Sequence, residues 1–218
     1  MAACRAVIFD LDGVILDSER VALGRWRQVG EELGLAGIDE VYVRCIGTTP
    51  AMTREIMEEA YGPAFSMETF YALLRSRFSR GDTPQMPVKA GSREILKALK
   101  AATLRLALAS SSPEDYVRRE LDGAGLLDFF DLLVCGDMVT RSKPDPEIFL
   151  KAAALSGTEP AETWVIEDSY NGIRAAHAAG MHPLMVPDLL PPDAEMRQKA
   201  EAILPDLLAA RDYLLKRI

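Results

Sequence analysis

A short apolar run that ends in two acidic residues constrains this chain more than any other stretch of its sequence. The run from Ala6 to Phe9 contains no polar residue, as expected for a strand that is covered on both faces of a parallel sheet. Asp10, Asp12 and Gly13 follow directly. Side chains alternate along an extended chain, so both acids face one side, and parallel sheets bind ligands at the carboxyl ends of their strands. The stretch predicts a buried strand that ends at a candidate site, although an Asp-x-Asp pair by itself equally fits loop acids that cap a turn.

From Val88 onward, helical and extended patterns alternate along the chain. The predicted helices are residues 92–100, 113–121, 146–155, 172–179 and 206–216, and the predicted strands are residues 104–109, 132–135, 164–166 and 183–186. Such alternation is typical of a parallel sheet with helices on both faces. The expected fold class is therefore α/β, with a doubly wound, Rossmann-like core.

The segment between the first strand and this alternation is helical in pattern. A helix is predicted after Ser18, which is a candidate N-cap, and further helices are predicted at residues 50–61 and 67–80. Turn residues from Gly81 to Pro87 predict a return linker. The predicted domains are thus a core made of residues 1–18 and 87–218, and a helical domain of residues 19–86 inserted after the first strand.

Further polar residues lie where other predicted strands end. Ser110 and Ser111 follow one strand, Lys143 lies in the loop after the next, and Glu167 with Asp168 follows a third. Taken singly, such a serine is usually a helix cap and such a lysine a surface residue. Their joint placement favours one shared site. Gathered carboxylates need a cation, because each like-charge pair about 4 Å apart costs about 4 kcal/mol at an effective dielectric constant of 20.

The order of these motifs along the chain (Asp10 and Asp12, then Ser110, Lys143 and the Glu167–Asp168 pair) resembles that of the haloacid dehalogenase-like superfamily. The resemblance spans Asp10 to Asp168, and the branch it fits best holds small sugar-phosphate phosphatases and β-phosphoglucomutase. It implies that the helical insertion is a cap domain, that Mg²⁺ is the cofactor and that the reaction passes through an aspartyl-phosphate.

The resemblance also implies a role for each matching residue. Asp10 is the expected nucleophile, and Asp12 is the expected general acid and base. The expected phosphate-binding residues are Ser110, Ser111 and Lys143, with backbone N–H groups at the start of the helix at Pro113. The expected Mg²⁺ ligands are Asp10, Asp12 through its carbonyl oxygen, Glu167 and Asp168.

The activity expected from this resemblance is hydrolysis of a small phosphorylated metabolite, a sugar phosphate, by a Mg²⁺-dependent phosphatase. A phosphohexomutase of the β-phosphoglucomutase type is the alternative. That mutase carries a histidine and an arginine in its cap where this sequence has Ala22 and Pro50, but Arg54 lies nearby and leaves the alternative open. A catalytically inactive binding protein is disfavoured, because every motif residue is present.

Composition excludes several other classes of protein. The net charge of −8 leaves no basic stripe for nucleic acid or an anionic membrane. The cysteines Cys4, Cys45 and Cys135 are odd in number and lack a Cys-x-x-Cys pair, so we expect reduced, buried thiols. No apolar run is long enough to cross a membrane and the amino-terminal sequence does not have the pattern of a signal peptide. We therefore expect a cytoplasmic protein, monomeric by default.

Overall fold

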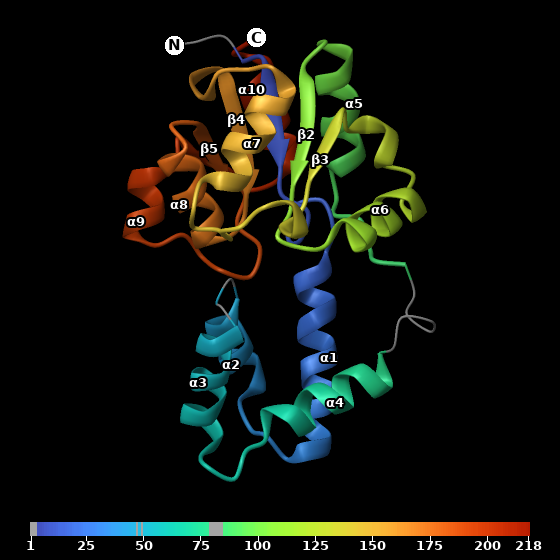
Figure 1. The fold of residues 1–218 in the computed structure, drawn as a ribbon, viewed down its shortest axis with the longest axis vertical. Helices are drawn as coiled ribbons and strands as arrows, with labels where there is room; N and C mark the ends of the chain where they lie inside the picture. Colours follow the sequence, from blue (N-terminus) through green and yellow to red (C-terminus); the bar gives the residue numbers. More distant parts are fainter. Residues whose placement is uncertain (1–3, 47, 49, 79–84) are drawn as a thin grey trace. The chain divides into compact units, whose positions relative to one another are not determined.

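The structure is a computed structural model of the chain, and it describes residues 4–46, 48, 50–78 and 85–218. The chain divides into two compact units (Figure 1). Met1–Asp17 and Met86–Ile218 form the first, which we call the α/β unit, and Ser18–Gln85 form the second, which we call the helical unit. None of the described helices has the length and apolar character needed to cross a membrane.

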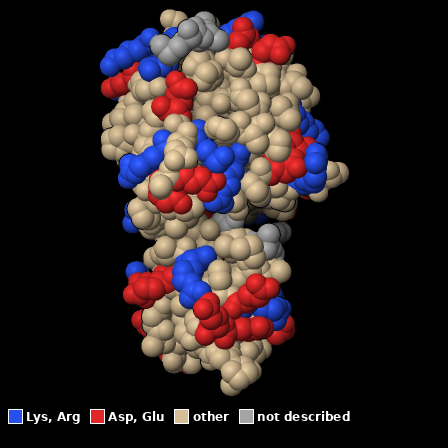
Figure 2. Space-filling model, turned by 90° about the vertical axis from the view of Figure 1, so that its left-hand side faces the viewer, with Lys and Arg blue, Asp and Glu red and all other residues tan. Residues whose placement is uncertain are grey.

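Charged residues of both signs are interspersed on the surface of each unit, as the face in Figure 2 shows. Some of them form exposed ion pairs, such as the pair of Arg27 with Asp39 at 2.6 Å. Exposed pairs of this kind contribute only about 0–1 kcal/mol each. Cys4, Cys45 and Cys135 are free and buried, so the predicted burial is confirmed.

The helical unit has a small aromatic core. Its helices are α1 (Ser18–Leu33), α2 (Ile38–Cys45), α3 (Pro50–Tyr61) and α4 (Met67–Arg77). The Trp26 ring packs edge to face against Tyr42 and Phe70, with ring centroids 5.0 and 4.9 Å apart. Such pairs add about 0.5–1.5 kcal/mol beyond the area they bury.

The helical unit differs from the sequence-based expectation in two respects, and a third expectation lies partly outside the described residues. The helix α2 was not predicted. The N-cap prediction for Ser18 was wrong, because its buried hydroxyl has no hydrogen-bond partner among the described residues. Part of the predicted linker, residues 81–84, and the predicted helical residues 79 and 80 lie outside the described residues.

A six-stranded sheet forms the centre of the α/β unit. The strands are β1 (Ala6–Phe9), β2 (Arg105–Ala109), β3 (Leu132–Val134), β4 (Thr163–Glu167), β5 (His182–Met185) and β6 (Ala202–Ile203). Their order is β3-β2-β1-β4-β5-β6, and each neighbouring pair is parallel. This is the Rossmann-type order, which confirms the predicted doubly wound sheet. Only the two-residue strand β6 was not predicted.

Helices cover both faces of this sheet (Figure 1). They are α5 (Ser92–Ala101), α6 (Glu114–Gly123), α7 (Glu147–Ser156), α8 (Tyr170–Ala178), α9 (Ala194–Lys199) and α10 (Leu207–Leu215), with short 3-10 turns at Leu127–Phe129, Gly136–Met138 and Pro160–Glu162. Residues of α5, α6 and α10 share one hydrophobic cluster with the sheet, and residues of α7 and α8 share another. The predicted helices of this unit are all present, whereas α9 was not predicted.

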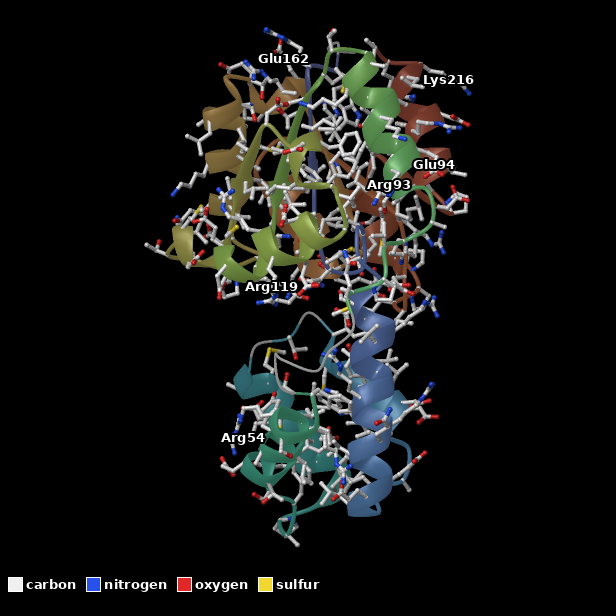
Figure 3. All side chains as sticks on the ribbon, turned by 90° about the vertical axis from the view of Figure 1, so that its right-hand side faces the viewer. Arg54, Arg93, Glu94, Arg119, Glu162 and Lys216 are labelled. Carbon is white, nitrogen blue, oxygen red and sulfur yellow. The ribbon has the colours of Figure 1, made fainter. Side chains whose placement is uncertain are left out.

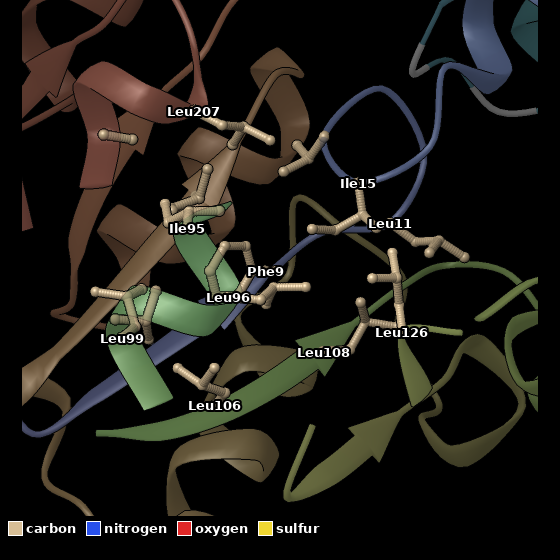
Figure 4. Close-up of a cluster of buried hydrophobic side chains, with 14 of the residues drawn as sticks. Phe9, Leu11, Ile15, Ile95, Leu96, Leu99, Leu106, Leu108, Leu126 and Leu207 are labelled. Carbon is tan, nitrogen blue, oxygen red and sulfur yellow. The ribbon is translucent and has the colours of Figure 1, made fainter. Parts of the chain in front are cut away.

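The central strand β1 contributes to both clusters, as its unbroken apolar sequence predicts. Phe9 lies with Ile95 and Leu96 of α5 in the cluster on one face (Figure 4), to which Val7 also belongs, and Ile8 belongs to the cluster on the other face. All four residues of β1 are completely buried. Each large apolar side chain buried in this way contributes about 1.5–3 kcal/mol to folding. The strand that carries Asp10 is therefore fixed from both sides.

The two segments that connect the units pair with each other inside the α/β unit. Leu16 and Val88 form an antiparallel bridge. The Asp17 amide donates to the Pro87 carbonyl at 2.8 Å, and the Lys89 amide donates to the Ile15 carbonyl at 2.9 Å. The chain therefore leaves the α/β unit and returns to it at one place, directly after the loop that contains Asp10 and Asp12.

Candidate active site

The carboxyl ends of β1, β2 and β4 meet at the ammonium group of Lys143. Its Nζ lies 2.6 Å from Asp10 Oδ1, 2.7 Å from Glu167 Oε1 and 3.1 Å from the Ala109 carbonyl oxygen. The side chains of Lys143, Asp10 and Glu167 are 7%, 10% and 1% exposed. The Asp10 amide donates to the Ile166 carbonyl at 3.0 Å, so Asp10 continues the pairing of β1 with β4. Three residues distant in sequence are thus held together by a buried ion-pair network.

Glu167 is fixed through both of its carboxylate oxygens. Oε1 faces Lys143, and Oε2 accepts hydrogen bonds from the Asp168 amide (3.1 Å), the Ser169 amide (3.0 Å) and the Ser169 hydroxyl (2.9 Å). Ser169 also caps α8 by accepting from the Gly172 amide at 3.0 Å. A Cβ atom built on Gly172 would overlap the Glu167 carboxylate. Glycine is therefore required at the start of α8 for the carboxylate to lie there.

Three carboxylates of this site could hold a metal ion. Asp10, Glu167 and Asp168 are buried, and each offers an oxygen within 4.8 Å of the other two. A buried set of carboxylate oxygens suits a hard divalent cation such as Mg²⁺, which also removes their mutual repulsion. Gly13 makes room for this arrangement: it has φ of +80°, and a Cβ atom there would overlap the Asp168 carboxylate. The residues present therefore fit Mg²⁺.

The Asp12 carboxylate is not part of that group and instead faces the loop after β2. Its Oδ2 accepts a hydrogen bond from the Ser112 hydroxyl at 3.0 Å. The Ser112 amide donates to the hydroxyl oxygen of Ser110, which is 1% exposed, at 3.0 Å. Sequence reasoning selected Ser110 and Ser111 but missed Ser112. The run of three serines was visible, but its pairing with Asp12 depends on two loops that are distant in sequence.

A turn after β3 supports the same loop. The Gly136 amide donates to the Ser112 carbonyl at 3.0 Å, beside the exposed residue Ser111. The Asp137 carboxylate accepts from the Glu114 amide at 3.2 and 3.3 Å. The expectation that the first amides of this helix face phosphate is therefore corrected for Glu114, whose N–H group is taken by Asp137.

The loop that carries Lys143 is held by Glu147, the first residue of α7. The Glu147 carboxylate accepts from the amide and the hydroxyl of Thr140, both at 2.8 Å, and from the Arg141 amide at 3.0 Å. These hydrogen bonds from Thr140 and Arg141 lower the pKa of Glu147 to about 2. Glu147 is a supporting residue that the sequence pattern did not indicate.

Burial and neighbouring charges together shift the pKa values of Asp10 and Lys143. Burial raises the pKa of Asp10 to about 8; Lys143 opposes this shift, and the negative charges of Glu167 and Asp12 add to it. Burial acts to lower the pKa of Lys143, but the charges of Asp10 and Glu167 outweigh it and raise that pKa above its usual range. Lys143 is therefore a permanent cation here, and ionised Asp10 requires further positive charge nearby.

Asn171 in α8 and Arg54 of the helical unit each have partners of their own. Oδ1 of Asn171 accepts a hydrogen bond from Arg174 Nη1 at 3.0 Å. Arg54 lies on the outer side of α3 (Figure 3), where it pairs with Glu68 at 2.9 Å and with Glu58 at 4.0 Å. Arg54 is thus engaged by two carboxylates of the helical unit.

The fold and the site together define a Rossmann-like α/β protein whose acidic centre lies at the carboxyl ends of its central strands. The family profile described as haloacid dehalogenase-like hydrolase matches residues 7–186. The chain belongs to this family.

Individual relatives agree with the family match. The phosphorylated carbohydrates phosphatase of Thermotoga maritima is 34% identical over 176 residues, which cover 81% of this chain and 82% of that protein. The validoxylamine A 7'-phosphate phosphatase of Streptomyces hygroscopicus subsp. limoneus is 30% identical over 207 residues, 95% of this chain and 96% of that protein. A crystal structure of a HAD family hydrolase from Deinococcus radiodurans, with bound phosphate and sodium, is 29% identical, has a TM-score of 0.84 and covers 100% of this chain and 97% of that one. The enzyme class of the chain is that of a phosphoric monoester hydrolase.

Proposed function

We propose that the protein is a Mg²⁺-dependent phosphatase that hydrolyses a small phosphorylated carbohydrate through an aspartyl-phosphate on Asp10. The observation that carries this proposal is the position of Asp10, paired with Lys143 at 2.6 Å and within reach of Asp168 across a possible cation site. The substrate class is supported by relatives that are named as phosphatases of phosphorylated carbohydrates and of a 7'-phosphate.

In the first step, the Asp10 carboxylate attacks the phosphorus atom. A bond forms between an Asp10 oxygen and phosphorus, the bond from phosphorus to the leaving oxygen breaks, and Asp12 gives a proton to that oxygen. In the second step, Asp12 takes a proton from water, the water oxygen bonds to phosphorus, and Asp10 is released together with inorganic phosphate. Asp12 is thus restored to its protonated form.

The other residues of the site position the phosphate group and balance its negative charge. Lys143 and the loop of Ser110 and Ser111 bind the phosphate oxygens, while Asp168, Asp10, Glu167 and the Asp12 carbonyl oxygen would hold Mg²⁺. When bound, Mg²⁺ neutralises negative charge between the carboxylates and the phosphate. Because Glu167 already accepts four hydrogen bonds, its contribution also includes fixing the backbone that leads into α8.

A panel of phosphorylated metabolites tests the proposal directly. We expect phosphate release from sugar phosphates with Mg²⁺ and its loss with a chelator. The Asp10→Asn variant should fold and release no phosphate from p-nitrophenyl phosphate, whereas Asp39→Asn, which alters an exposed ion pair, should retain activity. Undiminished turnover by Asp10→Asn would overturn the nucleophile assignment, and turnover unaffected by the chelator would overturn the cofactor.

The same assay separates hydrolysis from the mutase alternative. Ala22 at the position of the mutase histidine, and the ion pairs of Arg54 with Glu58 and Glu68, favour hydrolysis. With β-glucose 1-phosphate and glucose 6-phosphate as substrates, we expect free phosphate and no interconversion. Interconversion of these isomers without phosphate release would overturn the choice of hydrolysis.

A further inference from the structure

A hollow within the helical unit is lined by two arginines and several apolar side chains. Its volume is about 250 Å³, and its lining comes from α1 and from the end of α4: Ala22, Arg25, Trp26, Leu74, Arg75 and Phe78. Pockets for drug-sized ligands have volumes of about 300–1,000 Å³. This hollow, which we call the Arg25–Arg75 hollow, therefore has the size for a smaller molecule.

Its two arginines differ from other arginines of the same unit. Ion pairs to carboxylates occupy Arg27, Arg44, Arg54 and Arg77. Among the described residues, no carboxylate pairs with Arg25 or Arg75. The Arg25 guanidinium lies 5.2 Å from the centre of the Phe78 ring, which holds it at the hollow. Two arginines at one hollow, with no acidic partner among the residues that the structure describes, are therefore available to an anionic ligand.

The rest of the lining defines what that anion is attached to. Trp26 is 9% exposed, and Leu74 and Phe78 are half-buried, so the lining other than the two arginines is apolar. Inorganic anions alone would leave this surface uncovered. A molecule with a carboxylate or phosphate on a carbon skeleton satisfies both parts, because guanidinium groups bind such oxygens in pairs and the skeleton covers the apolar surface.

We propose that the Arg25–Arg75 hollow binds a small organic anion, with its carboxylate or phosphate held by Arg25 and Arg75. The anion is either the remote end of the substrate or a separate effector. The first case rests on the proposed phosphatase function, and the second does not.

Calorimetric titration with 6-phosphogluconate, which carries a phosphate and a carboxylate, tests the site without turnover in an Asp10→Asn background. The test variant combines Arg25→Gln with Arg75→Gln. The control combines Arg27→Gln with Arg77→Gln, which removes the same charge from the same two helices but at arginines that have partners. We expect Kd to rise at least about tenfold in the test variant, the equivalent of one charged hydrogen bond, and to stay within about twofold in the control.

Equal Kd values in the two double variants, or absence of 6-phosphogluconate binding to the Asp10→Asn protein, would overturn the proposal. If the test variant does not fold, the single variant Arg75→Gln replaces it, because Arg75 is exposed. Its control is Arg77→Gln, and the expected difference in Kd is the same.

Steady-state kinetics then distinguish the two sources of the anion. If it belongs to the substrate, the test variant raises KM for 6-phosphogluconate about tenfold more than KM for glucose 6-phosphate, which lacks the carboxylate. If it is a separate effector, the two KM values change equally while the calorimetric Kd still rises. A protein that binds 6-phosphogluconate through these arginines but releases no phosphate from any substrate would refute the phosphatase and leave the binding site standing.

Discussion

The hydroxyl of Ser112 donates a hydrogen bond to Asp12 Oδ2 at 3.0 Å, and this bond joins the loop after β1 to the loop after β2. The Ser112 backbone is itself held at both ends, since its amide donates to the Ser110 hydroxyl oxygen and its carbonyl accepts from the Gly136 amide. The loop after β2 therefore contributes to fixing the direction of the Asp12 carboxyl group.

We expect Ser112→Ala to lower kcat/KM, which reports the first step, about tenfold or more for an alkyl phosphate, because a hydrogen bond to a charged group is worth about 1.5–3 kcal/mol. The loss of kcat/KM should be smaller for p-nitrophenyl phosphate, whose leaving oxygen needs no proton. Ser112→Thr keeps the hydroxyl and should restore activity. An equal loss on both substrates, with no rescue by threonine, would indicate a purely structural role for Ser112.

Lys143→Met should destabilise the fold by about 3–5 kcal/mol, because it leaves Asp10 and Glu167 buried without their cation. Urea unfolding measures this, and added Mg²⁺ should recover part of the loss. The matched control is Lys97→Met on the exposed side of α5, which should change stability by no more than about 0.5 kcal/mol. Similar values for the two variants would contradict the buried network.

Mg²⁺ affinity should depend on pH through Asp10. Since its pKa without a bound metal ion is raised to about 8, protons compete with Mg²⁺ below that pH. The Kd for Mg²⁺, measured by calorimetry, should fall by up to about tenfold per unit as pH rises from about 6 to 8 and should level off above that. Asp10→Asn should bind Mg²⁺ more weakly, without this slope. A flat Kd in the wild-type protein would count against a raised Asp10 pKa.

Gly172→Ala should destabilise the protein by about 1–3 kcal/mol, although alanine is the better helix former, because its Cβ atom overlaps the Glu167 carboxylate. Phosphatase activity should fall with it. Gly24→Ala in α1 meets no atom within 4 Å and should stabilise by about 0.5–1 kcal/mol. Thermal unfolding of the two variants should therefore shift in opposite directions.

Glu147→Gln should remove an acid-dependent part of the stability. The pKa of Glu147 is lowered from an ordinary 4.5 to about 2, so its contribution is complete above pH 4.5 and is lost as pH falls towards 2. Over this range the thermal midpoint should fall more in the wild-type protein than in the variant. At neutral pH the variant should also show lower activity, because the loop of Lys143 is less well held. Parallel pH profiles would exclude this role for Glu147.

Sequence reasoning worked where local pattern decides the structure. Ala6–Phe9 is a strand because both of its faces are buried, and the ends of adjacent parallel strands bring Asp10 and Glu167 together. The short elements α2 and β6 were not predicted, because eight and two residues are too few to show a clear hydrophobic periodicity. Ser112, Glu147 and the Arg25–Arg75 hollow depend on contacts between segments that are distant in sequence or on which acid neutralises which base. No spacing rule encodes these contacts.

The pairing of Leu16 with Val88 has a consequence for how such a chain can diversify. The chain between these two residues is a single insertion, and the two segments that flank it are hydrogen-bonded to each other. We expect a different insertion at this place to leave the register of β1 beside β2 and β4 unchanged. The spacing of Asp10, Lys143 and Glu167 would then also be unchanged. Under our proposal that the helical unit binds an organic anion, the chemistry and the choice of ligand reside in separate parts of one polypeptide and can vary independently.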